Sequence, residues 1–507
     1  MAELPHVDKE RQRDAPLRVD DMVEDILPAT PTAAVRVIVR DRTDLGRWGE
    51  ARVSAAQLPS DSNANPARSP STSLLAWADV PWLAVAVLTA VVLRIAWVVY
   101  VNVDPNDGRL DDTVFYHNAA RYLAEGAGYV DPWWGGPTAA WPPGYPAALA
   151  VLYKLFGWHV VLAKGLNIAF AAATVALTYV LARRIFDQRV AYLGALTLAC
   201  FPGQIYFSTL VFAENMFAMI FVLVLLLTLV WTVERKEARW WQVLLLGSLV
   251  GLAGLVRAEG LFLAAVLVGL WAVAVRPWRK VASYAALLAL GVALPLAPWT
   301  VRNAVQLDQF VPLRTGGGGA LALALDPDTP PYSLVKGPET RSVSEGIRYQ
   351  LTHPVRLFSY AGEKLRYLYG DDSDGIHAIL NLPAVQFTPS YRPPIPEEVG
   401  QLWRGLANRY FFAVGAAALV AAALCLVRRN RASYVLLGAV LGWTLLFAII
   451  SPVSRYHFPL VPIMSILAGA FLVFAWDGAR SLGRTWSLQR AAGEVARPTE
   501  AGERPAG

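Results

Sequence analysis

The chain has little cysteine and little charge for its length. Only two cysteines occur among 507 residues, and both, Cys200 and Cys425, lie inside apolar runs. The segments between these runs therefore hold no thiol for a disulfide bond or a cysteine metal site. Only 17% of the residues are charged. No Gly-rich fingerprint follows a predicted strand, so no nucleotide-binding fold is indicated, and no nucleic-acid motif accompanies the formal charge of +6.

Long apolar runs are what the sequence has in abundance. Hydrophobic residues make up 55% of the chain, and several runs approach the ~20 residues needed to cross a bilayer core of ~30 Å. This pattern predicts an all-α polytopic membrane protein with about ten spanning helices. The expected spans are 80–103, 160–182, 189–207, 210–233, 240–256, 258–275, 281–301, 409–427, 432–450 and 456–476.

Residues 142–158 are apolar but barely long enough to span. If they lie on the outer surface as an interfacial helix, every basic cluster between spans faces the cytoplasm, as the positive-inside rule prefers. If they span, the same clusters face outward. We therefore expect an outer loop at 104–158 and a larger one at 302–408, between the seventh and eighth spans, with the cytoplasmic membrane as the location. The clusters include Arg183, Arg184, Arg189, Arg235, Arg239, Arg279, Lys280, Arg428, Arg431, Arg480 and Arg484.

The two ends of the chain differ in composition from the middle. Residues 1–73 are rich in charge, Pro, Ser and Asn, which is typical of disorder. We expect a mostly disordered cytoplasmic tail at 1–73, a transmembrane domain at 74–476 and a second cytoplasmic tail at 477–507.

Several ionisable residues fall within or at the outer ends of the predicted spans. Charge at mid-bilayer costs from ~2.5 kcal/mol upward, so such groups normally face a bundle interior or a cavity with a partner. On this topology they converge on one outward-facing level. An acid there, opposite basic groups, is what inverting sugar transfer from a polyprenyl phosphate requires. The residues are Arg94, Asp111, Asp112, Glu214, Arg257, Glu259, Arg302, Arg455 and His457.

Short motifs in a fixed order carry a resemblance to a known family. From about residue 80 to 476 the chain resembles the GT-C glycosyltransferases, as a bacterial member similar to the dolichyl-phosphate-mannose protein mannosyltransferases and the lipid A aminoarabinose transferase. The motifs are DDTVFYHNAARYLAEGAGY, WPPGYPAALAVLYKLFG, LVFAENMF, GLAGLVRAEGL, PWTVRNAVQLDQFVPLRTGGGG and SRYHFPLVPIMSILAG.

The resemblance implies a GT-C fold, interfacial helices in the first outer loop and a lipid-linked sugar donor. It also implies a catalytic carboxylate in that loop, four residues before an aromatic. This spacing selects Asp112, with Tyr116 as the aromatic, and leaves Asp111 as the second candidate. Candidate substrate-binding residues are Tyr116, Arg94, Glu214, Arg257, Arg302, Arg455 and His457.

The chain departs from both relatives in two places. Trp141-Pro142 stands where the aminoarabinose transferase has Lys-Pro, so that phosphate contact has to come from another group. Asp112-Thr113 stands where the protein mannosyltransferases have Asp-Glu. Their folded lumenal domain is also missing, so a protein acceptor is not implied.

Each candidate residue also has a structural interpretation. Asp111 and Asp112 could be solvated loop carboxylates, and Glu214 and Arg94 could pair within the bundle. Arg257 and Glu259 could mark a helix end, since i, i+2 neighbours do not face each other on a helix. Tyr116 could serve in packing, and Arg302 could cap its helix. Arg455 and His457 could anchor the chain at the membrane interface.

The expected function is transfer of a hexose, with mannose first, from a polyprenyl phosphate to a protein, glycolipid or polysaccharide acceptor on the outer face. One alternative is a transporter or flippase. Transporters often contain paired internal repeats, and the chain shows no second copy of the motifs. A second alternative is a non-catalytic envelope assembly factor. No cofactor is required, and no protein metal site is expected. Asp111 and Asp112 could still recruit a divalent cation together with phosphate oxygens.

Overall fold

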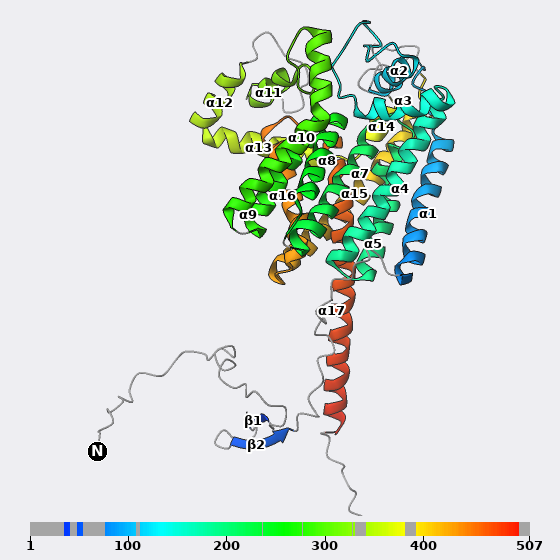
Figure 1. Ribbon diagram of the computed structural model, residues 1–507. Helices are drawn as coiled ribbons and strands as arrows, with labels where there is room; N and C mark the ends of the chain where they lie inside the picture. The colour runs from blue at the N-terminus through cyan, green and yellow to red at the C-terminus, as the bar shows by residue number, and fades with distance from the viewer. Residues whose placement is uncertain are drawn as a thin grey trace, which may run out of the picture. The chain divides into compact units, whose positions relative to one another are not determined.

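The computed structural model describes residues 35–40, 48–53, 77–107, 112–235, 237–275, 277–326, 328–329, 341–380 and 392–495 (Figure 1). Asp111 lies outside the described residues. The chain divides into two compact units, Met1–Ser73 and Leu74–Gly507.

In the first unit, β1 (Val35–Arg40) and β2 (Trp48–Val53) form an antiparallel pair. Val35 faces Val53 and Arg40 faces Trp48 across the pair. The sequence of β1, VRVIVR, is rich in β-branched residues, which favour strands. This hairpin was not anticipated in the tail expected to be mostly disordered, and that expectation stays a prediction for the rest of the segment.

The regular elements of the second unit, among its described residues, are all helices, as the sequence predicted. Its helices are η3 (Trp77–Asp79), α1 (Val80–Tyr100), α2 (Asp112–Glu125), α3 (Gly144–Phe156), α4 (Val160–Ile185), α5 (Gln188–Ala199), α6 (Pro202–Tyr206), α7 (Glu214–Thr228), η4 (Leu229–Glu234), α8 (Trp240–Val256), η5 (Ala258–Phe262), α9 (Leu263–Ala274), α10 (Trp278–Leu307), α11 (Gly317–Leu325), α12 (Val343–Thr352), α13 (Pro354–Tyr369), α14 (Asp374–Leu380), α15 (Glu397–Val427), η7 (Arg431–Ser433), α16 (Tyr434–Ile449), η8 (Ser454–Leu460) and α17 (Val461–Val495).

Seven helical segments of the described chain are long and apolar enough to cross a membrane. They correspond to seven of the predicted spans. The other three predictions fall on shorter helices: α8, η5 with α9, and the α5–α6 pair. Pro202 separates α5 from α6 because proline fits the first turn of a helix but not its interior. The count of ten spans therefore stays a prediction.

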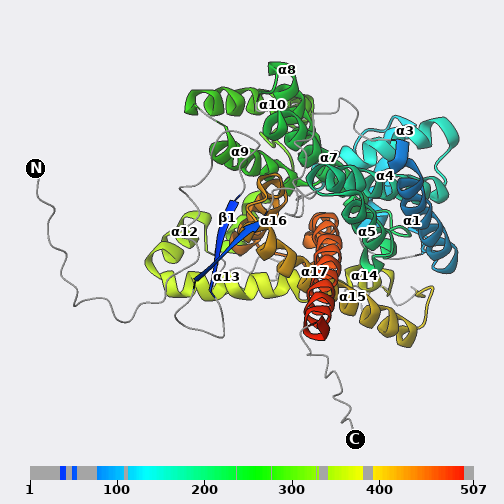
Figure 2. The ribbon, with the colours of Figure 1, turned by 90° about the horizontal axis from the view of Figure 1, so that it is seen from below.

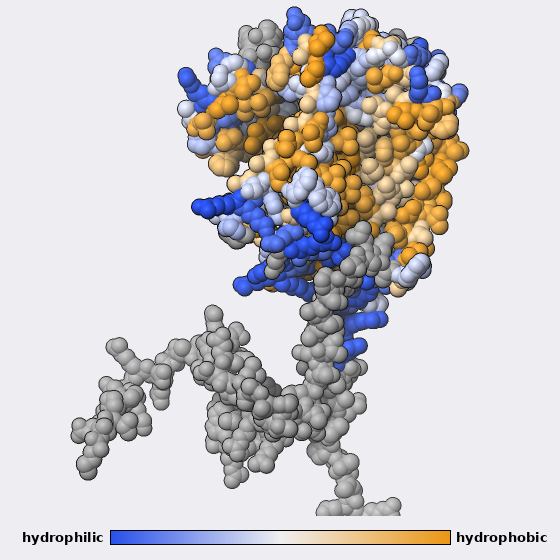
Figure 3. Space-filling view, in the orientation of Figure 1, coloured by the Kyte–Doolittle hydropathy of each residue, from blue (hydrophilic) through white to orange (hydrophobic). Residues whose placement is uncertain are grey.

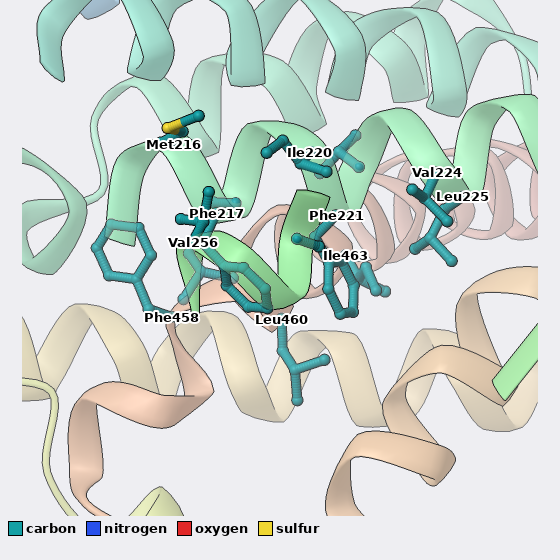
Figure 4. Close-up of a cluster of buried hydrophobic side chains, with 14 of the residues drawn as sticks. Met216, Phe217, Ile220, Phe221, Val224, Leu225, Val256, Phe458, Leu460 and Ile463 are labelled. Atoms are coloured by element: carbon teal, nitrogen blue, oxygen red, sulfur yellow. The ribbon is translucent and has the colours of Figure 1, made fainter. Parts of the chain in front are cut away.

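The centre of the bundle is built by α7 and by the helix that runs from η8 into α17. In each, 72% of the most apolar window is buried, against 22% in α1 and α10. Figure 4 shows the contact: Phe217 and Phe221 of α7 lie beside Phe458, Leu460 and Ile463. Seen from below, α1, α4 and α5 lie on one side of α17, and α9, α10 and α16 lie on the other (Figure 2).

Small residues let α8 and α10 approach closely. A Cβ atom on Gly291 would lie 2.2 Å from the carbonyl oxygen of Leu244, and one on Gly247 would lie 2.3 Å from that of Leu288. Such glycines suit helix pairs in membranes, where close backbone packing replaces the hydrophobic effect as the driving force.

Helices α2, α3 and α11 to α14 gather at one end of the bundle, here named the loop end, and α17 projects from the opposite end (Figure 1). An apolar band separates polar side chains at the two ends (Figure 3). At 13 residues, α3 is ~20 Å long and too short to span. Its exposed Val151, Leu155 and Phe156 suit a helix lying at the membrane surface, as expected for the first outer loop.

Candidate active site

Asp112 is the first residue of α2 at the loop end. Its Oδ1 accepts a hydrogen bond from Nε1–H of Trp141 at 3.2 Å, and its Oδ2 accepts one from Nη2 of Arg455 at 2.8 Å. The side chain of Asp112 is 23% exposed. The carboxylate is therefore fixed in direction by two donors and is still partly accessible, which a positioned proton acceptor requires.

Trp141 owes its position to the aromatic residues around it. Its ring stacks on Phe115 with 4.1 Å between centroids, and the ring of Trp133 lies 5.8 Å away. Its carbonyl oxygen accepts a hydrogen bond from the Tyr129 hydroxyl at 3.1 Å. From the sequence, Trp141 was noted only as the residue before Pro142. Its bond to Asp112 joins residues 29 positions apart, and no spacing rule reveals such a contact.

Arg455 lies in η8, in the turn before α17. Besides Asp112 it approaches Glu214, with 3.7 Å between Nε and Oε1. Its guanidinium also stands over the ring of Phe212, 5.2 Å from the centroid. Arg455 thus bridges a carboxylate of the first outer loop and a carboxylate at the start of α7.

Arg257 is a second cation that contacts Glu214. It donates through Nη1 to Glu214 and through Nε to Glu259, the latter at 2.5 Å. Arg257 and Glu259 mark a helix end, which was the structural interpretation of this pair: Arg257 is the C-cap of α8, and its extended backbone angles (φ −146°, ψ 128°) let the two side chains meet. Burial lowers the pKa of Arg257, but Glu259 and Glu214 outweigh burial and raise the pKa well above its usual value.

Three carboxylates and two guanidinium cations therefore lie together: Asp112, Glu214 and Glu259 with Arg257 and Arg455. We name these five residues the charge cluster. A small pocket beside it is lined by Glu214, Phe217, Arg257, Glu259, Trp443, Arg455, Tyr456, Phe458 and Pro459. Four of these residues are charged, and the other five are aromatic residues and a proline.

Tyr116 lies one helical turn after Asp112, as the spacing predicted. It is 5% exposed, and its ring packs against Tyr145 with 5.4 Å between centroids. Burial raises its pKa, and the negative charge of Asp112 raises the pKa further. Tyr116 is therefore a neutral wall of the site, and its part in substrate binding stays a prediction.

Three predicted residues bond outside the charge cluster. Arg94 donates to the carbonyl oxygens of Ala90 and Ala199 at 3.2 and 3.0 Å. Arg302 donates to those of Thr138 and Tyr129 at 2.7 and 2.8 Å and so holds the first outer loop. The bonds of Arg302 to Thr138 and Tyr129 differ from the helix capping that had been considered for this residue.

His457 is the third of these residues. Its Nε2 lies 2.8 Å from Oδ1 of Asp372, and its Nδ1 lies 2.8 Å from the carbonyl oxygen of Leu368. Since a carbonyl only accepts, Nδ1 carries a proton, and a second proton is shared between Nε2 and the carboxyl group. Burial raises the pKa of Asp372 to about 6, against the opposing effect of His457.

Among the described residues, no group of three or more His, Cys, Asp and Glu could hold a metal ion. A cation recruited by Asp111 and Asp112 involves a residue outside the described chain, so that hypothesis stays untested.

Comparisons with known proteins address the fold. The dolichyl-phosphate-mannose-protein mannosyltransferase family matches residues 140–301, about a third of the chain. This segment includes Trp141, Glu214 and Arg257 but neither Asp112 nor Arg455. Comparison with curated proteins gave no match.

Solved structures of two other proteins resemble most of the chain. The oligosaccharyltransferase of Archaeoglobus fulgidus in its apo form has 15% identity and a TM-score of 0.50, over 83% of this chain and 52% of that one. The same enzyme tethered to an acceptor peptide has 17% identity and a TM-score of 0.51, with the same coverage. ArnT from Cupriavidus metallidurans bound to undecaprenyl phosphate has 18% identity and a TM-score of 0.47, over 84% of this chain and 66% of that one.

This chain thus spans about half the length of the archaeal enzyme. At such identities the likeness shows the fold. The resemblance stated from the sequence is confirmed: the chain has the GT-C fold, and its residues 140–301 match the dolichyl-phosphate-mannose-protein mannosyltransferase family.

Proposed function

We propose that this protein is a membrane glycosyltransferase that moves a hexose, with mannose as the first candidate, from a polyprenyl phosphate to an acceptor. The reaction inverts the anomeric carbon, and Asp112 is its general base. One observation carries the proposal: Asp112, a partly exposed carboxylate, is held by hydrogen bonds from Trp141 and from Arg455, and Arg455 shares Glu214 with the second cation, Arg257.

The proposed step uses the residues as follows. Asp112 takes the proton of the acceptor hydroxyl as its oxygen forms a bond to the anomeric carbon. The bond from that carbon to the phosphate oxygen breaks, and the electron pair leaves with the polyprenyl phosphate. Arg455 and Arg257 hold the negative charge that develops on this phosphate, because bidentate guanidinium groups match phosphate oxygens.

The bundle favours a lipid-linked donor over a soluble one. The pocket beside the charge cluster has Phe217, Trp443 and Phe458 as apolar walls, and these residues lie on spans or directly before one. A prenyl chain would remain in the bilayer while its phosphate meets the arginines. The matched family is named for a dolichyl phosphate donor of mannose, which supports the same donor class.

The acceptor lies on the loop end in this proposal. Basic residues such as Arg183, Arg189 and Arg428 lie toward the α17 end, where Arg189 pairs with Asp477 at 2.8 Å and Arg428 stands over Phe474. By the positive-inside rule the α17 end is cytoplasmic and the loop end faces outward. The archaeal enzyme of similar fold was solved with an acceptor peptide, so a peptide is one acceptor to offer beside glycolipids and polysaccharides.

The proposal is tested by sugar transfer with purified protein in lipid vesicles. Radiolabelled polyprenyl-phosphate mannose and a membrane extract are offered to the unmodified protein and to Asp112→Asn. The nearly isosteric variant should fold and yet lose ~100-fold or more of the transfer rate, which is the usual contribution of a positioned general base.

Two control variants sharpen the result. Asp131→Asn changes another carboxylate of the same loop, whose Oδ1 accepts from the backbone of Trp133 and Trp134, and should retain transfer. Asp111→Asn should be milder than Asp112→Asn. Full transfer by Asp112→Asn would exclude Asp112 as the base, and label that crosses the bilayer without a new product would favour a transporter.

A further inference from the structure

Four consecutive residues of the large outer loop, Asp371, Asp372, Ser373 and Asp374, run from the connection after α13 to the first residue of α14. We name them the DDSD segment. Two of them, Asp372 and Asp374, contact the turn that carries Arg455. The motif was not singled out in the sequence because its partners lie more than 80 residues later.

Asp374 contacts Arg455 itself. Its Oδ2 accepts a hydrogen bond from the backbone N–H of Arg455 at 2.7 Å. Arg455 is the second residue of η8, and the first N–H groups of a helical turn have no partner within that turn. Asp374 therefore supplies an acceptor at the residue whose side chain reaches Asp112.

Asp372 contacts the same turn two residues later, through the ring of His457. The pair is buried, with His457 at 1% and Asp372 at 8% exposure. Gly203 of α6 leaves the room for this carboxylate, because a Cβ atom at that position would lie 2.2 Å from Oδ2 of Asp372. Two carboxylates of one segment thus hold η8 on both sides of Tyr456.

The DDSD segment is in turn fixed to α15. The backbone N–H of Asp372 donates to Oδ1 of Asn408 at 2.7 Å, and Arg404 donates to the hydroxyl of Ser373 at 3.3 Å. The carboxylates of the segment are therefore fixed relative to α15. A shift of the segment would move the backbone of Arg455 relative to the rest of the charge cluster.

We propose that Asp372 and Asp374 are positioning residues through which the large outer loop sets the distance between Arg455 and Asp112. This inference rests on the proposed function, in which Asp112 takes a proton and Arg455 holds the phosphate. It gives the large loop a mechanical link to the reacting groups.

The first experiment separates kcat from KM in the transfer assay. Asp374→Ala removes the acceptor, and a misplacement of about 1 Å can cost ~100-fold in rate, so kcat per folded protein should fall about 10- to 100-fold. The KM for the acceptor should stay within about twofold of the unmodified value, since the acceptor does not bind Arg455 in this scheme. Asp374→Asn keeps a carbonyl oxygen at the same place and should restore kcat to within about threefold, the scale of one hydrogen bond.

The matched control is Asp371→Asn. Asp371 belongs to the same segment, and its Oδ1 accepts from the backbone N–H of Ser373 at 3.0 Å. This variant should keep kcat. A loss of folded protein with unchanged kcat in Asp374→Ala would show a merely structural role and overturn the proposal. If Asp374→Ala does not fold, Asp372→Leu, which removes the acceptor of His457, replaces it with the same expected fall in kcat.

A second measurement does not depend on transfer. Thermal unfolding is compared for Asp374→Ala, Asp112→Asn and the double variant. If Asp374 acts through the pair of Arg455 and Asp112, its substitution should lower Tm less once Asp112 has been changed, because residues in one network are not additive. Equal shifts in both backgrounds would overturn the positioning role. A non-additive result without any transfer would instead point to a failure of the proposed function.

Discussion

Five cations of the helical unit form two sets that differ in what they bind. Arg94, Arg302 and Lys364 donate to backbone carbonyl oxygens: Lys364 to Ala324 at 2.6 Å and to Ile449. Arg257 and Arg455 pair with carboxylates. The first set ties one segment to another, and the second set forms the charge cluster.

The difference follows from the chemistry of the partners. A carbonyl oxygen carries no net charge and cannot take up a proton at physiological pH, so a cation bound to it serves as a fixed tie. A carboxylate can gain a proton, and an anionic substrate can compete with it for the same guanidinium. Burial and charge alone do not distinguish the two sets, since both contain nearly buried side chains.

The largest expected difference is between Arg455 and Arg302. Arg455→Gln should lower transfer about 100- to 1,000-fold, the scale seen when one donor to a developing negative charge is removed. Arg302→Gln should lower Tm and change kcat by less than tenfold, about 1.4 kcal/mol. Rates and unfolding midpoints of both variants measure this, and equal losses of kcat would abolish the distinction between the two sets.

Glu214→Gln should have the next largest effect, on stability. Glu214 is 2% exposed and faces both Arg257 and Arg455. Its loss removes the carboxylate that the two cations share and leaves each of them with one acid, Glu259 or Asp112, so unfolding should become easier by ~1.5–3 kcal/mol, the scale of a hydrogen bond to a charged group. Glu234→Gln is the matched control. Glu234 pairs with Arg184 at 3.3 Å and is 30% exposed, and the cost there should stay below ~1 kcal/mol. Equal shifts in denaturation would contradict the central place of Glu214.

Lys364 sharpens the comparison through pH. Burial lowers its pKa from 10.5 to about 8, so the folded state loses this proton more readily than the unfolded state does. Stability should therefore rise between pH 8 and pH 10 by ~1.4 kcal/mol per pH unit, and it should be lower by the full amount below pH 8. Unfolding of the protein and of Lys364→Met across this range measures the effect. The rise should be missing in the variant, and parallel curves would contradict it.

The smallest effect is expected at Trp141. Trp141→Phe keeps the stack on Phe115 but removes the donor to Asp112, so transfer should fall about 2- to 10-fold, in line with ~0.5–1.5 kcal/mol for one hydrogen bond. Trp133→Phe is the control, because Nε1 of Trp133 has no hydrogen-bond partner among the described residues. Equal rates for both variants would show that the indole N–H does not direct the carboxylate.

Sequence reasoning named every member of the charge cluster without showing which of them meet. Asp112, Glu214, Arg257, Glu259 and Arg455 were named as charges within or at the outer ends of spans, and the structure brings them together. Arg94, Arg302 and His457 satisfied the same criterion and lie elsewhere, because the rule detects costly charge without detecting its partner. Trp141 and Asp374 gave no such signal, since an indole and a loop carboxylate are common at a membrane surface.

The sequence also did not predict the local backbone geometry. Arg257 itself is extended between α8 and η5, and this conformation directs its side chain toward both Glu214 and Glu259. Arg302 bonds to Thr138, 164 residues away, and His457 bonds to Asp372, 85 residues away. Contacts across such distances arise from packing of the helices, which hydropathy and spacing do not describe.

The sequence alone determined that this is a helical membrane protein of the GT-C fold and placed the carboxylate four residues before Tyr116. These features are local in the sequence: the length of apolar runs, the basic clusters and the short motifs. Because a membrane span needs a minimum apolar length and basic residues favour the cytoplasmic side, run length and charge predict the topology without tertiary contacts. The tertiary structure decided which charges meet. A buried cation needs a partner within about 3 Å, and only the packed bundle determines whether this partner is a carbonyl oxygen or a carboxylate.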